Sequence, residues 1–320
     1  LENAMDTDKQ KNSNRNPLQL GQTNISFILQ TMKKELITSD PKQSFRFFSW
    51  EGSLDNIVKH AEEGADIGDS EGMGDAWHYH PEIELTLFTE GQGIRYIGDN
   101  VSSFNAPDLV LLGANLPHYW DTDHSSGYCI QFLFDPTSPL AALHESGSLK
   151  SLLDKANKGL KFSNNCLEDI LPLLEQCKQA KSLERLTLLL KVLDRLNNAQ
   201  TSEISSYVPQ GLSESNNIVI KKAVQYIVKH ATDEDLVIQH VLDHVNMSRA
   251  TFSRHFQKVL GLSFTQFLQS IRLEKARNLL VSSDKSITEI AFESGFSNLS
   301  HFNKIFKKRW SMSPRELRNI

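Results

Sequence analysis

Apolar residues recur at helical spacing through the last hundred positions of the chain, where one short pattern occurs twice. Each copy contains two phenylalanines four residues apart, and residues at that spacing share one face of a helix. The two pairs are Phe252 with Phe256 and Phe302 with Phe306. The segments upstream of them, Leu236–Val245 and Ile287–Ser294, also carry apolar residues at helical spacing. The pattern predicts two helix pairs, each with a short turn between its helices.

Residues at the expected helix ends support the same interpretation. Ser248 and Ser297 precede the second helix of each copy, and a serine hydroxyl can accept a hydrogen bond from a backbone N–H of the first turn. Gly295 lies between the two helices of the second copy, where a left-handed backbone would strain most other residues. We therefore predict Ser248 and Ser297 as N-caps and Gly295 as a turn residue.

The face of each second helix opposite the phenylalanines is short, polar and basic. Small and amide side chains beside Arg and Lys are what a helix needs to enter a DNA major groove. The residues expected to face bases are Ala250, Ser253, Arg254, Ser300, Asn303 and Lys304. The residues expected to contact phosphates are Lys258, Lys307, Lys308 and Arg309. A helix predicted over Ser263–Leu280, about 25 Å long, would hold the two copies at a distance comparable to one DNA turn.

Landmarks of the two copies occur in the same order in a known family. They are Met247-Ser248, Phe252, Arg254, Phe256 and Gly261, then Ile271–Ala276, and finally Ile287–Ala291, Gly295–Ser297, His301-Phe302, Phe306–Lys308 and Ser313-Pro314. With them, residues 218–320 resemble the DNA-binding domain of the AraC/XylS family of bacterial transcription regulators. The resemblance implies two helix-turn-helix units, at residues 236–259 and 287–309. Leu242 departs from the family, which commonly has a small Ala there, so the first unit is expected to pack more openly. A helical bundle with a merely solvated basic face is the alternative.

Between residues 41 and 136 the pattern changes to short apolar or aromatic runs separated by Gly, Asn, Asp and Pro. Such runs predict β-strands. They cover Phe45–Phe48, Ile83–Phe88, Gly93–Ile97, Leu109–Leu112 and Cys129–Phe134. Several short strands with turns of this kind predict a small β-barrel or a double-sheet jelly roll.

Candidate metal ligands lie within this region. His78, His80 and Glu84 have the same parity, so a regular strand would point them to one face, although Pro81 interrupts the ladder between them. His118 would arrive from another strand and complete a set of nitrogen and oxygen ligands for a divalent transition metal such as Zn, Fe, Mn or Ni. The same side chains would serve equally well as hydrogen-bond partners of a polar effector, so both interpretations stay open.

The spacing of Gly72, His78, His80, Glu84 and Gly91 resembles the first cupin motif, and residues 113–118 resemble a looser form of the second. A cupin-like sensor ahead of such a DNA-binding domain is the usual arrangement in the AraC/XylS family. The resemblance implies that the sensor binds a small organic effector. Sensors of this kind have often lost the metal, whereas the ligand set is complete here.

Three further residues are candidate effector contacts. Trp77 and Trp120 flank the histidines and would stack on a sugar ring or close the barrel mouth, but a tryptophan in a small barrel is more often a core residue. Arg95 would hold a carboxylate or phosphate of the effector, with a solvated edge charge as the alternative. The predicted effector site comprises Trp77, His78, His80, Glu84, Arg95, His118 and Trp120.

Residues 137–206 return to helical spacing and are predicted as a helical dimerisation region. Its helices are expected over Leu149–Ala156, Leu167–Gln176 and Ser182–Asn198. The last is apolar on more than one face, so it must pack on the barrel, on a second subunit, or on both. The family resemblance favours a homodimer, and an intramolecular core helix is the alternative. Residues 207–217 are predicted as a linker, residues 1–40 as a disordered or tag segment with a helix over Asn24–Leu36, and Glu62–Asp75 as a mobile acidic loop.

Charge separates the two halves of the chain. The whole chain carries −5, but residues 212–320 hold 16 basic and 10 acidic residues, a net of +6, which leaves −11 for the remainder. Attraction to DNA phosphates must therefore come from the C-terminal part. Three cysteines at no metal-like spacing indicate reduced thiols in a cytoplasmic protein, and no apolar run approaches the ~18 residues of a membrane helix.

The sequence as a whole predicts a multidomain α+β protein. A cupin-like β-barrel with following helices precedes an all-α domain with two helix-turn-helix units. The function predicted is that of a sequence-specific transcription regulator, without enzyme activity, controlled by a small-molecule effector such as a sugar or a related polar metabolite. Its expected partners are double-stranded DNA, the effector and a second copy of the chain, with RNA polymerase a further candidate and no membrane. The alternative is a metal-dependent cupin enzyme with a DNA-binding appendage.

Overall fold

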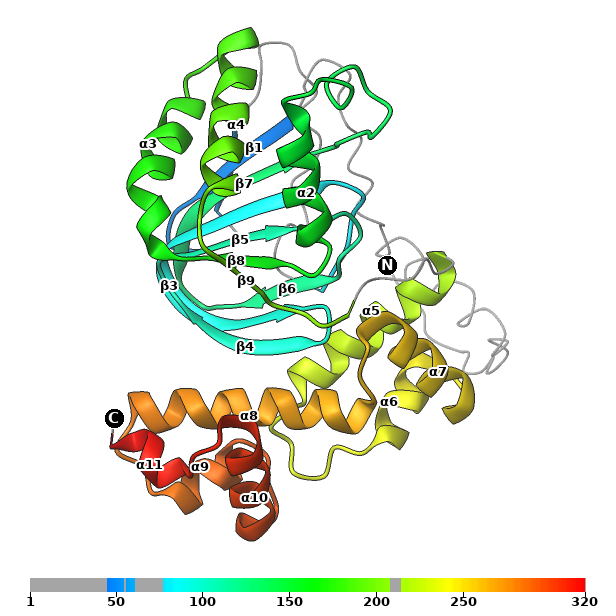
Figure 1. Cartoon of the computed structure of the whole chain (residues 1–320). Coiled ribbons are helices and arrows are strands. Elements are labelled where there is room, and N and C mark those ends of the chain that lie inside the picture. Colours follow the sequence, from blue (N-terminus) through cyan, green and yellow to red (C-terminus); the bar gives the residue numbers. More distant parts are fainter. Residues whose placement is uncertain (1–44, 55, 61–76, 208–213, 320) are drawn as a thin grey trace, which may run out of the picture. The chain divides into compact units, whose positions relative to one another are not determined.

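The computed structural model describes residues 45–54, 56–60, 77–207 and 214–319, and Figure 1 shows the chain with its elements labelled. The helix predicted over Asn24–Leu36, the acidic loop Glu62–Asp75 and Gly72 of the cupin-like motif lie outside the described residues. The fold is mixed, with a sheet-rich N-terminal region and a helical C-terminal region.

The N-terminal region is built on one curved sheet. Its strands are β1 Phe45–Trp50, β2 Ile57–His60, β3 Ile83–Ile97, β4 Asn100–Asn105, β5 Asp108–Leu112, β6 His118–Asp121, β7 Ser125–Phe132, β8 Leu160–Phe162 and β9 Thr201–Glu203. The main path runs β2-β1-β7-β3-β5-β8-β9, and β4 and β6 pair with the remaining part of β3.

Strand β3 is 15 residues long and belongs to both parts of this sheet. Its first half pairs with β5 and β7, and its second half pairs with β4 and β6. The register to β7 shifts between Phe88 and Glu90, which is the irregularity that lets a long strand bend. The two strands predicted over Ile83–Phe88 and Gly93–Ile97 are therefore one bent strand.

Residues 137–206 do not form a purely helical region. Helices α2 Ser146–Ala156, α3 Leu167–Cys177 and α4 Ser182–Asn197 occur where helices are predicted, but β8 and β9 lie between and after them and extend the sheet. Strands of three residues are too short to give a periodic signal, which is why the sequence pattern did not indicate them. Figure 1 shows the three helices beside the sheet.

Helix α4, predicted to be apolar on more than one face, packs inside the chain. Its buried residues belong to the core that α2 and α3 share with strands β1, β3, β5 and β7. They are Leu188, Leu189, Val192, Leu193 and Leu196. Leu183 at the start of α4 is 74% exposed. The intramolecular interpretation accounts for most of this stripe, and the homodimer remains a prediction.

The C-terminal region consists of helices. They are α5 Glu214–Lys229, α6 Ile238–Val245, α7 Arg249–Leu260, α8 Phe264–Ser282, α9 Ile287–Glu293, α10 Leu299–Trp310 and α11 Pro314–Arg318. Both predicted phenylalanine pairs are fully buried, the first in a core with α5, α6 and α8 and the second in a core with α8 and α9. The pairs α6–α7 and α9–α10 occur at the predicted positions, and α8 connects them.

The helix ends confirm one predicted cap and correct the other. The Ser248 side chain accepts from the Thr251 backbone N–H at the start of α7. At the start of α10 the cap is Asn298, whose Oδ1 accepts from the His301 backbone N–H at 2.8 Å, so the prediction of Ser297 is wrong. The two phenylalanine pairs are 50 residues apart, which places Asn298 and not Ser297 opposite Ser248, and asparagine caps a helix as well as serine does.

The turn residue of the second pair is confirmed. Gly295 has φ +89°, and a Cβ built there would lie 2.8 Å from Arg272 Nε and 2.9 Å from the Ala231 carbonyl oxygen. The first pair makes its turn at Asn246, also left-handed, with φ 51°. Asparagine tolerates this conformation better than most residues with a side chain.

Replacing Asn298 with alanine tests the corrected cap. We expect a loss of about 1 kcal/mol in the free energy of unfolding, because one N–H of the first turn of α10 loses its partner. Ser297→Ala is the matched control, since Ser297 is exposed and outside the helix, and it should change stability by less than about 0.5 kcal/mol. Denaturant unfolding of both variants measures the difference. Equal losses would contradict the assignment of the cap.

Candidate nucleic-acid interface and buried histidine site

Helices α7 and α10 each bury an apolar face and expose a basic one. The ten residues predicted to contact DNA are all exposed. On α7 they are Ala250, Ser253, Arg254 and Lys258, and on α10 they are Ser300, Asn303, Lys304, Lys307, Lys308 and Arg309. Beneath them the ring centroids of Phe252 and Phe256 lie 5.0 Å apart, and those of Phe302 and Phe306 lie 5.4 Å apart. The anchoring of each helix thus leaves its basic surface accessible.

Two of these residues also have contacts within the chain. The Arg309 guanidinium donates to the Val101 carbonyl oxygen at 3.3 Å. The backbone carbonyl of Lys258 accepts from the Tyr207 hydroxyl, while the Lys258 side chain is exposed. Lys307, Lys308 and Arg309 occupy the last turn of α10, where positive charge interacts favourably with the carboxyl end of the helix dipole. Basic residues at this end therefore also stabilise the helix that presents them.

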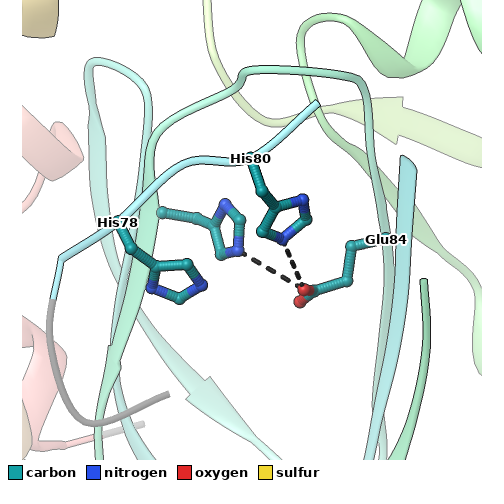
Figure 2. Close-up of side chains that lie close together, drawn as sticks. His78, His80 and Glu84 are labelled. Atoms are coloured by element: carbon teal, nitrogen blue, oxygen red, sulfur yellow. Dashed lines mark hydrogen bonds and ion pairs between the residues drawn. The ribbon is translucent and has the colours of Figure 1, made fainter. Parts of the chain in front are cut away.

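The second candidate site is a cluster of four buried side chains on the sheet. One ligand atom from each of His78, His80, Glu84 and His118 lies within 4.8 Å of the others. Figure 2 shows the side chains of His78, His80 and Glu84 pointing toward one another. All four residues are at most 6% exposed. The structure thus brings together the four residues predicted as a metal-ligand set.

The four side chains come from three segments. His78 and His80 lie just before β3, Glu84 lies in β3, and His118 begins β6. His78 and His118 exchange backbone hydrogen bonds of 3.0 and 2.8 Å, which hold the first segment against β6. Pro81 precedes β3 and lies outside the sheet ladder. The side chains of His78, His80 and Glu84 therefore still meet on one face, although only Glu84 lies in β3.

Hydrogen bonds fix the orientation of both imidazoles that face Glu84. His80 Nδ1 lies 3.1 Å from the Glu82 carbonyl oxygen, and His118 Nδ1 lies 2.8 Å from the Leu116 carbonyl oxygen. On the opposite side of each ring, His80 Nε2 is 3.0 Å and His118 Nε2 is 3.5 Å from Glu84 Oε2. Burial alone would raise the pKa of Glu84, but positive charge on His118 and His80 outweighs it and holds the pKa well below its ordinary value.

Two further residues of the site were missed by the sequence analysis. The Thr86 hydroxyl donates to Glu84 Oε1 at 2.7 Å, and the Gln131 Nε2 donates to Glu84 Oε2 at 2.9 Å. Thr86 has the same strand parity as Glu84, a signal that was available in the sequence. Gln131 is the register partner of Glu84 on β7. Its position depends on strand pairing, which local sequence does not reveal.

Of the three other predicted effector contacts, only Trp120 lies beside the histidine cluster. Trp120 lies beside the histidines, with its ring centroid 5.4 Å from that of His118. Trp77 instead packs in the core that contains Ile94, Tyr96 and Val101. Arg95 is buried, and its guanidinium donates to Asp108 at 2.6 Å. Among the described residues, Trp77 and Arg95 therefore have structural partners away from the histidines.

A small cavity of about 40 Å³ adjoins the cluster. Its polar lining comes from His78, Glu84, Thr86, Trp120 and Gln131. The remaining lining residues are apolar or a thiol, namely Phe48, Trp50, Leu54, Ile57, Phe88 and Cys129. A cavity of this size has room for a few water molecules at most, because roughly 10–15 Å³ on this measure admits one.

Comparisons with known proteins support an assignment for the C-terminal part. Residues 241–320 match the family described as "Helix-turn-helix domain". The HTH-type transcriptional activator RhaS of Enterobacter sp. (strain 638) is 27% identical over 247 residues, which covers 75% of this chain and 86% of the relative. The Xylose operon regulatory protein of Escherichia coli (strain K12) is 34% identical over 99 residues, 31% of this chain and 25% of the relative.

A solved structure is similar to about a third of this chain. The C-terminal domain of AraT, a response regulator from Geobacillus stearothermophilus, is 36% identical over 34% of this chain and 88% of that chain, with a TM-score of 0.31.

The chain therefore carries a helix-turn-helix domain, the class of module with which transcription regulators bind DNA. The matched region contains α7, α8, α9 and α10, with both exposed basic surfaces. Within the part of the chain that the structure describes, no helix combines the length and apolar character that crossing a membrane requires.

Proposed function

We propose that this protein is a sequence-specific transcription regulator of the AraC/XylS family, and that α7 and α10 are its two recognition helices. The observation that carries the proposal is the pair of exposed, basic, small-residue helix faces, each anchored by two buried phenylalanines. Helix α8 is 19 residues long, or about 28 Å at 1.5 Å per residue, and it separates the two recognition helices. That length suits two successive major grooves on one side of a duplex.

Each recognition helix divides its residues between two tasks. In this proposal Arg254 and Lys304, both exposed, donate to base edges, and the small residues beside them let the helix backbone approach the groove floor. Lys258, Lys307, Lys308 and Arg309 lie toward the carboxyl ends of the helices and bind phosphates. The phosphate contacts position the domain on DNA, and the base contacts select the sequence.

We further propose that the sheet region is a cupin-like sensor that controls DNA binding through an effector. The part of the chain outside residues 212–320 carries a charge of −11, which repels DNA phosphates. That part therefore has a role other than DNA binding. A relative named for the xylose operon favours a sugar or a related polar metabolite as the effector class. A homodimer, with each copy reading part of the operator, would let the effector change which DNA sites the two copies span together.

The buried cluster fits a divalent transition metal. Imidazole nitrogens and a carboxylate oxygen are the ligands that zinc, iron, manganese and nickel share. His118 Nε2 makes no hydrogen bond among the described residues although the residue is 1% exposed, so it is oriented as a ligand. His78, His80, Glu84 and His118 would hold the ion, which would supply positive charge to a buried set of acceptors.

A metal-dependent enzyme with a DNA-binding appendage is the second candidate, favoured by the same four ligands. Its substrate would have to fit beside the ion in a cavity of about 40 Å³, whereas pockets for small organic ligands usually measure roughly 300–1,000 Å³. An assay of metal-loaded protein for turnover of small polar substrates separates the two candidates. The enzyme must show turnover, whereas a regulator does not require it.

Selection of bound DNA from a random pool tests the main proposal directly. We expect the full chain to enrich one sequence that contains two half-sites about one helical turn apart. Enrichment of no sequence at moderate salt would contradict it. Repeating the selection with candidate sugars shows whether a sugar changes the preferred site.

The affinity for the selected DNA should fall steeply with salt. Four phosphate contacts per chain release about as many counterions, so we expect at least a ~100-fold loss between about 50 and 200 mM salt. Lys308→Ala should reduce the slope of log K against log salt by about 1, because it removes one such contact. Fluorescence anisotropy over the salt range measures both. A slope near zero would contradict the phosphate assignments.

A further inference from the structure

Strand β6 directs its side chains to two sides of the sheet, because successive residues of a strand point to opposite faces. His118 lies on the side of the histidine cluster, so Tyr119 and Asp121 lie on the other side. There Tyr119 packs on Tyr96 of β3, and the Tyr96 ring also contacts Phe267 of α8. This second side of β3 and β6 therefore faces α8 and is separate from the histidine cluster.

Hydrogen bonds hold α8 against the sheet at β4. The Ser103 backbone N–H and hydroxyl both donate to Glu274 Oε2, at 3.0 and 2.6 Å. The same hydroxyl lies 2.7 Å from Asn278 Oδ1, one turn further along α8. Glu274 is 2% exposed, and Arg277 Nη1 lies 3.6 Å from its Oε2. The buried carboxylate of Glu274 thus has its partners within the protein and needs no ligand.

A cleft of about 520 Å³ lies beside this contact. Its sheet wall comes from β3, β4 and the end of β6, and its helix wall comes from the carboxyl-terminal part of α8. Pockets for small organic ligands usually measure roughly 300–1,000 Å³, so the cleft is large enough for one, whereas the cavity of about 40 Å³ beside the histidines is not. Its polar lining includes Asn105, Asp121, Asp123, Lys275, Arg277 and Asn278.

Asp121 lines this cleft and lacks a partner. Its carboxylate makes no hydrogen bond or ion pair with any described residue, although it is half-buried. Burial raises the pKa of Asp121, the positive charge of Lys275 offsets this in part, and Asp123 raises the pKa further. A half-buried carboxylate without a hydrogen-bond donor is costly, and a hydroxyl group of a ligand would supply the donor.

The two walls offer complementary hydrogen-bonding groups. The ionised carboxylates of Asp121 and Asp123 on the sheet wall can only accept. Lys275 and Arg277 on the helix wall can only donate, and Asn278 can do both. Four of the ten polar lining residues are charged and six are amides or hydroxyls, which favours a neutral polyhydroxylated ligand over a zwitterion. Each hydroxyl of such a ligand donates and accepts, so one molecule can bond to both walls.

We infer that the cleft between α8 and strands β3, β4 and β6 is the effector site, and that it binds a neutral sugar or polyol. The inference rests on the proposed function and places its effector on the side of the sheet that faces α8, away from the histidines. Asp121 accepts from hydroxyls of the ligand, and Lys275 donates to them.

The position of the cleft gives a bound ligand a route to the recognition helices. The ligand contacts the sheet region and α8 at once, and α8 connects the helix pairs α6–α7 and α9–α10. Its affinity therefore depends on how α8 is held against the sheet. A ligand that binds one such arrangement more tightly shifts the chain toward it, and DNA affinity changes with that shift.

Sugar binding is tested first, without DNA. The full chain is titrated by calorimetry with D-xylose, D-ribose, D-glucose, D-galactose and D-mannitol separately. We expect at least one of them to bind once per chain with a Kd below about 1 mM and to raise the unfolding temperature. Asp121→Asn and Lys275→Met each remove one charged partner and should weaken binding by about 10–150-fold. Val281→Trp adds bulk to the cleft from a position that is 75% exposed, so it should fold and bind no sugar.

Three further variants are matched controls for these cleft variants. Asp169→Asn on α3 and Lys191→Met on α4 remove exposed charges of the same kind elsewhere in the sheet region. Thr86→Val keeps the side-chain shape but removes a hydrogen bond from the histidine cluster. All three should bind the sugar within about twofold of the unaltered chain. Unchanged binding in all three cleft variants would overturn the site, and binding of L-glutamate or L-lysine but of no sugar would overturn the ligand class.

The coupling is tested with the DNA sequence enriched from the random pool. We expect the sugar, at a concentration near its Kd, to change the affinity for that DNA by about 5–150-fold in the unaltered chain and in the two charge controls. In the three cleft variants the change should be under about twofold, and circular dichroism verifies that they are folded.

The remaining outcomes distinguish this inference from the proposed regulation of transcription. Specific DNA binding by a chain that binds none of the five compounds would overturn the inference and leave the transcription regulator intact. A sugar that binds in the cleft but leaves DNA affinity unchanged would overturn it in the same way. Sugar binding in the cleft with no specific DNA binding under any condition would instead overturn the proposed function.

Discussion

Replacing both Arg254 and Lys304 with alanine should lower the affinity for the specific DNA site by about 10²–10⁴-fold. Each residue is the long basic side chain at the centre of its exposed helix face, and a well-placed base contact contributes about 1–3 kcal/mol of discrimination. The two exposed residues lie on different helices, and these helices are anchored in separate cores, so their effects should add. Anisotropy with the selected DNA and with a scrambled duplex measures both affinity and preference.

The two single variants test whether each helix reads its own half-site. Arg254→Ala should relax the sequence preference in one half-site only, and Lys304→Ala in the other, because each helix reads its own groove. Lys150→Ala on α2 is a matched control, since it removes an exposed lysine from the sheet region and should leave affinity within about twofold. If the double variant binds the selected site as tightly as the unaltered chain, α7 and α10 are not the recognition helices.

The sequence predicted the helical region better than the sheet region because its signals are local. A phenylalanine pair four residues apart, a capping serine before it and a glycine at the turn all lie within about a dozen positions. Each signal acts through the first turns of one helix, so no distant pairing has to be known. The error at Ser297 has the same local origin, because two good capping residues stand next to each other and only the helix start decides between them.

The histidine site was predicted in part for a different reason. His78, His80 and Glu84 are close in sequence, so strand parity was enough to place them on one face. His118 came from a motif resemblance, and Gln131 could not be found because its position follows from the register between β3 and β7. The partner of Arg95, Asp108, comes from β5, and the local sequence did not indicate this pairing. Contacts between strands distant in sequence are what a single sequence conceals.

Phe302→Ala should unfold the second recognition helix, α10, while the first recognition helix, α7, stays folded. Phe302 is 0% exposed, and its ring centroid lies 5.1 Å from that of Phe296 and 5.4 Å from that of Phe306. Deleting a buried phenyl ring costs about 3–5 kcal/mol, through lost burial and the cavity left behind. The core of α9 and α10 is small and separate from the core around Phe252 and Phe256, so the loss should fall on that half of the domain.

A matched control exists on the adjacent helix, because Phe292 of α9 is 49% exposed and does not belong to that buried core. Phe292→Ala should change stability by less than about 1 kcal/mol and leave DNA binding intact. Amide hydrogen exchange should show α10 of Phe302→Ala losing protection while α7 keeps it, and a footprint on the selected DNA should shrink to one half-site. Loss of protection in both helices together would mean that the two helix pairs fold as one cooperative unit, and the division of the domain into two independent readers would be wrong.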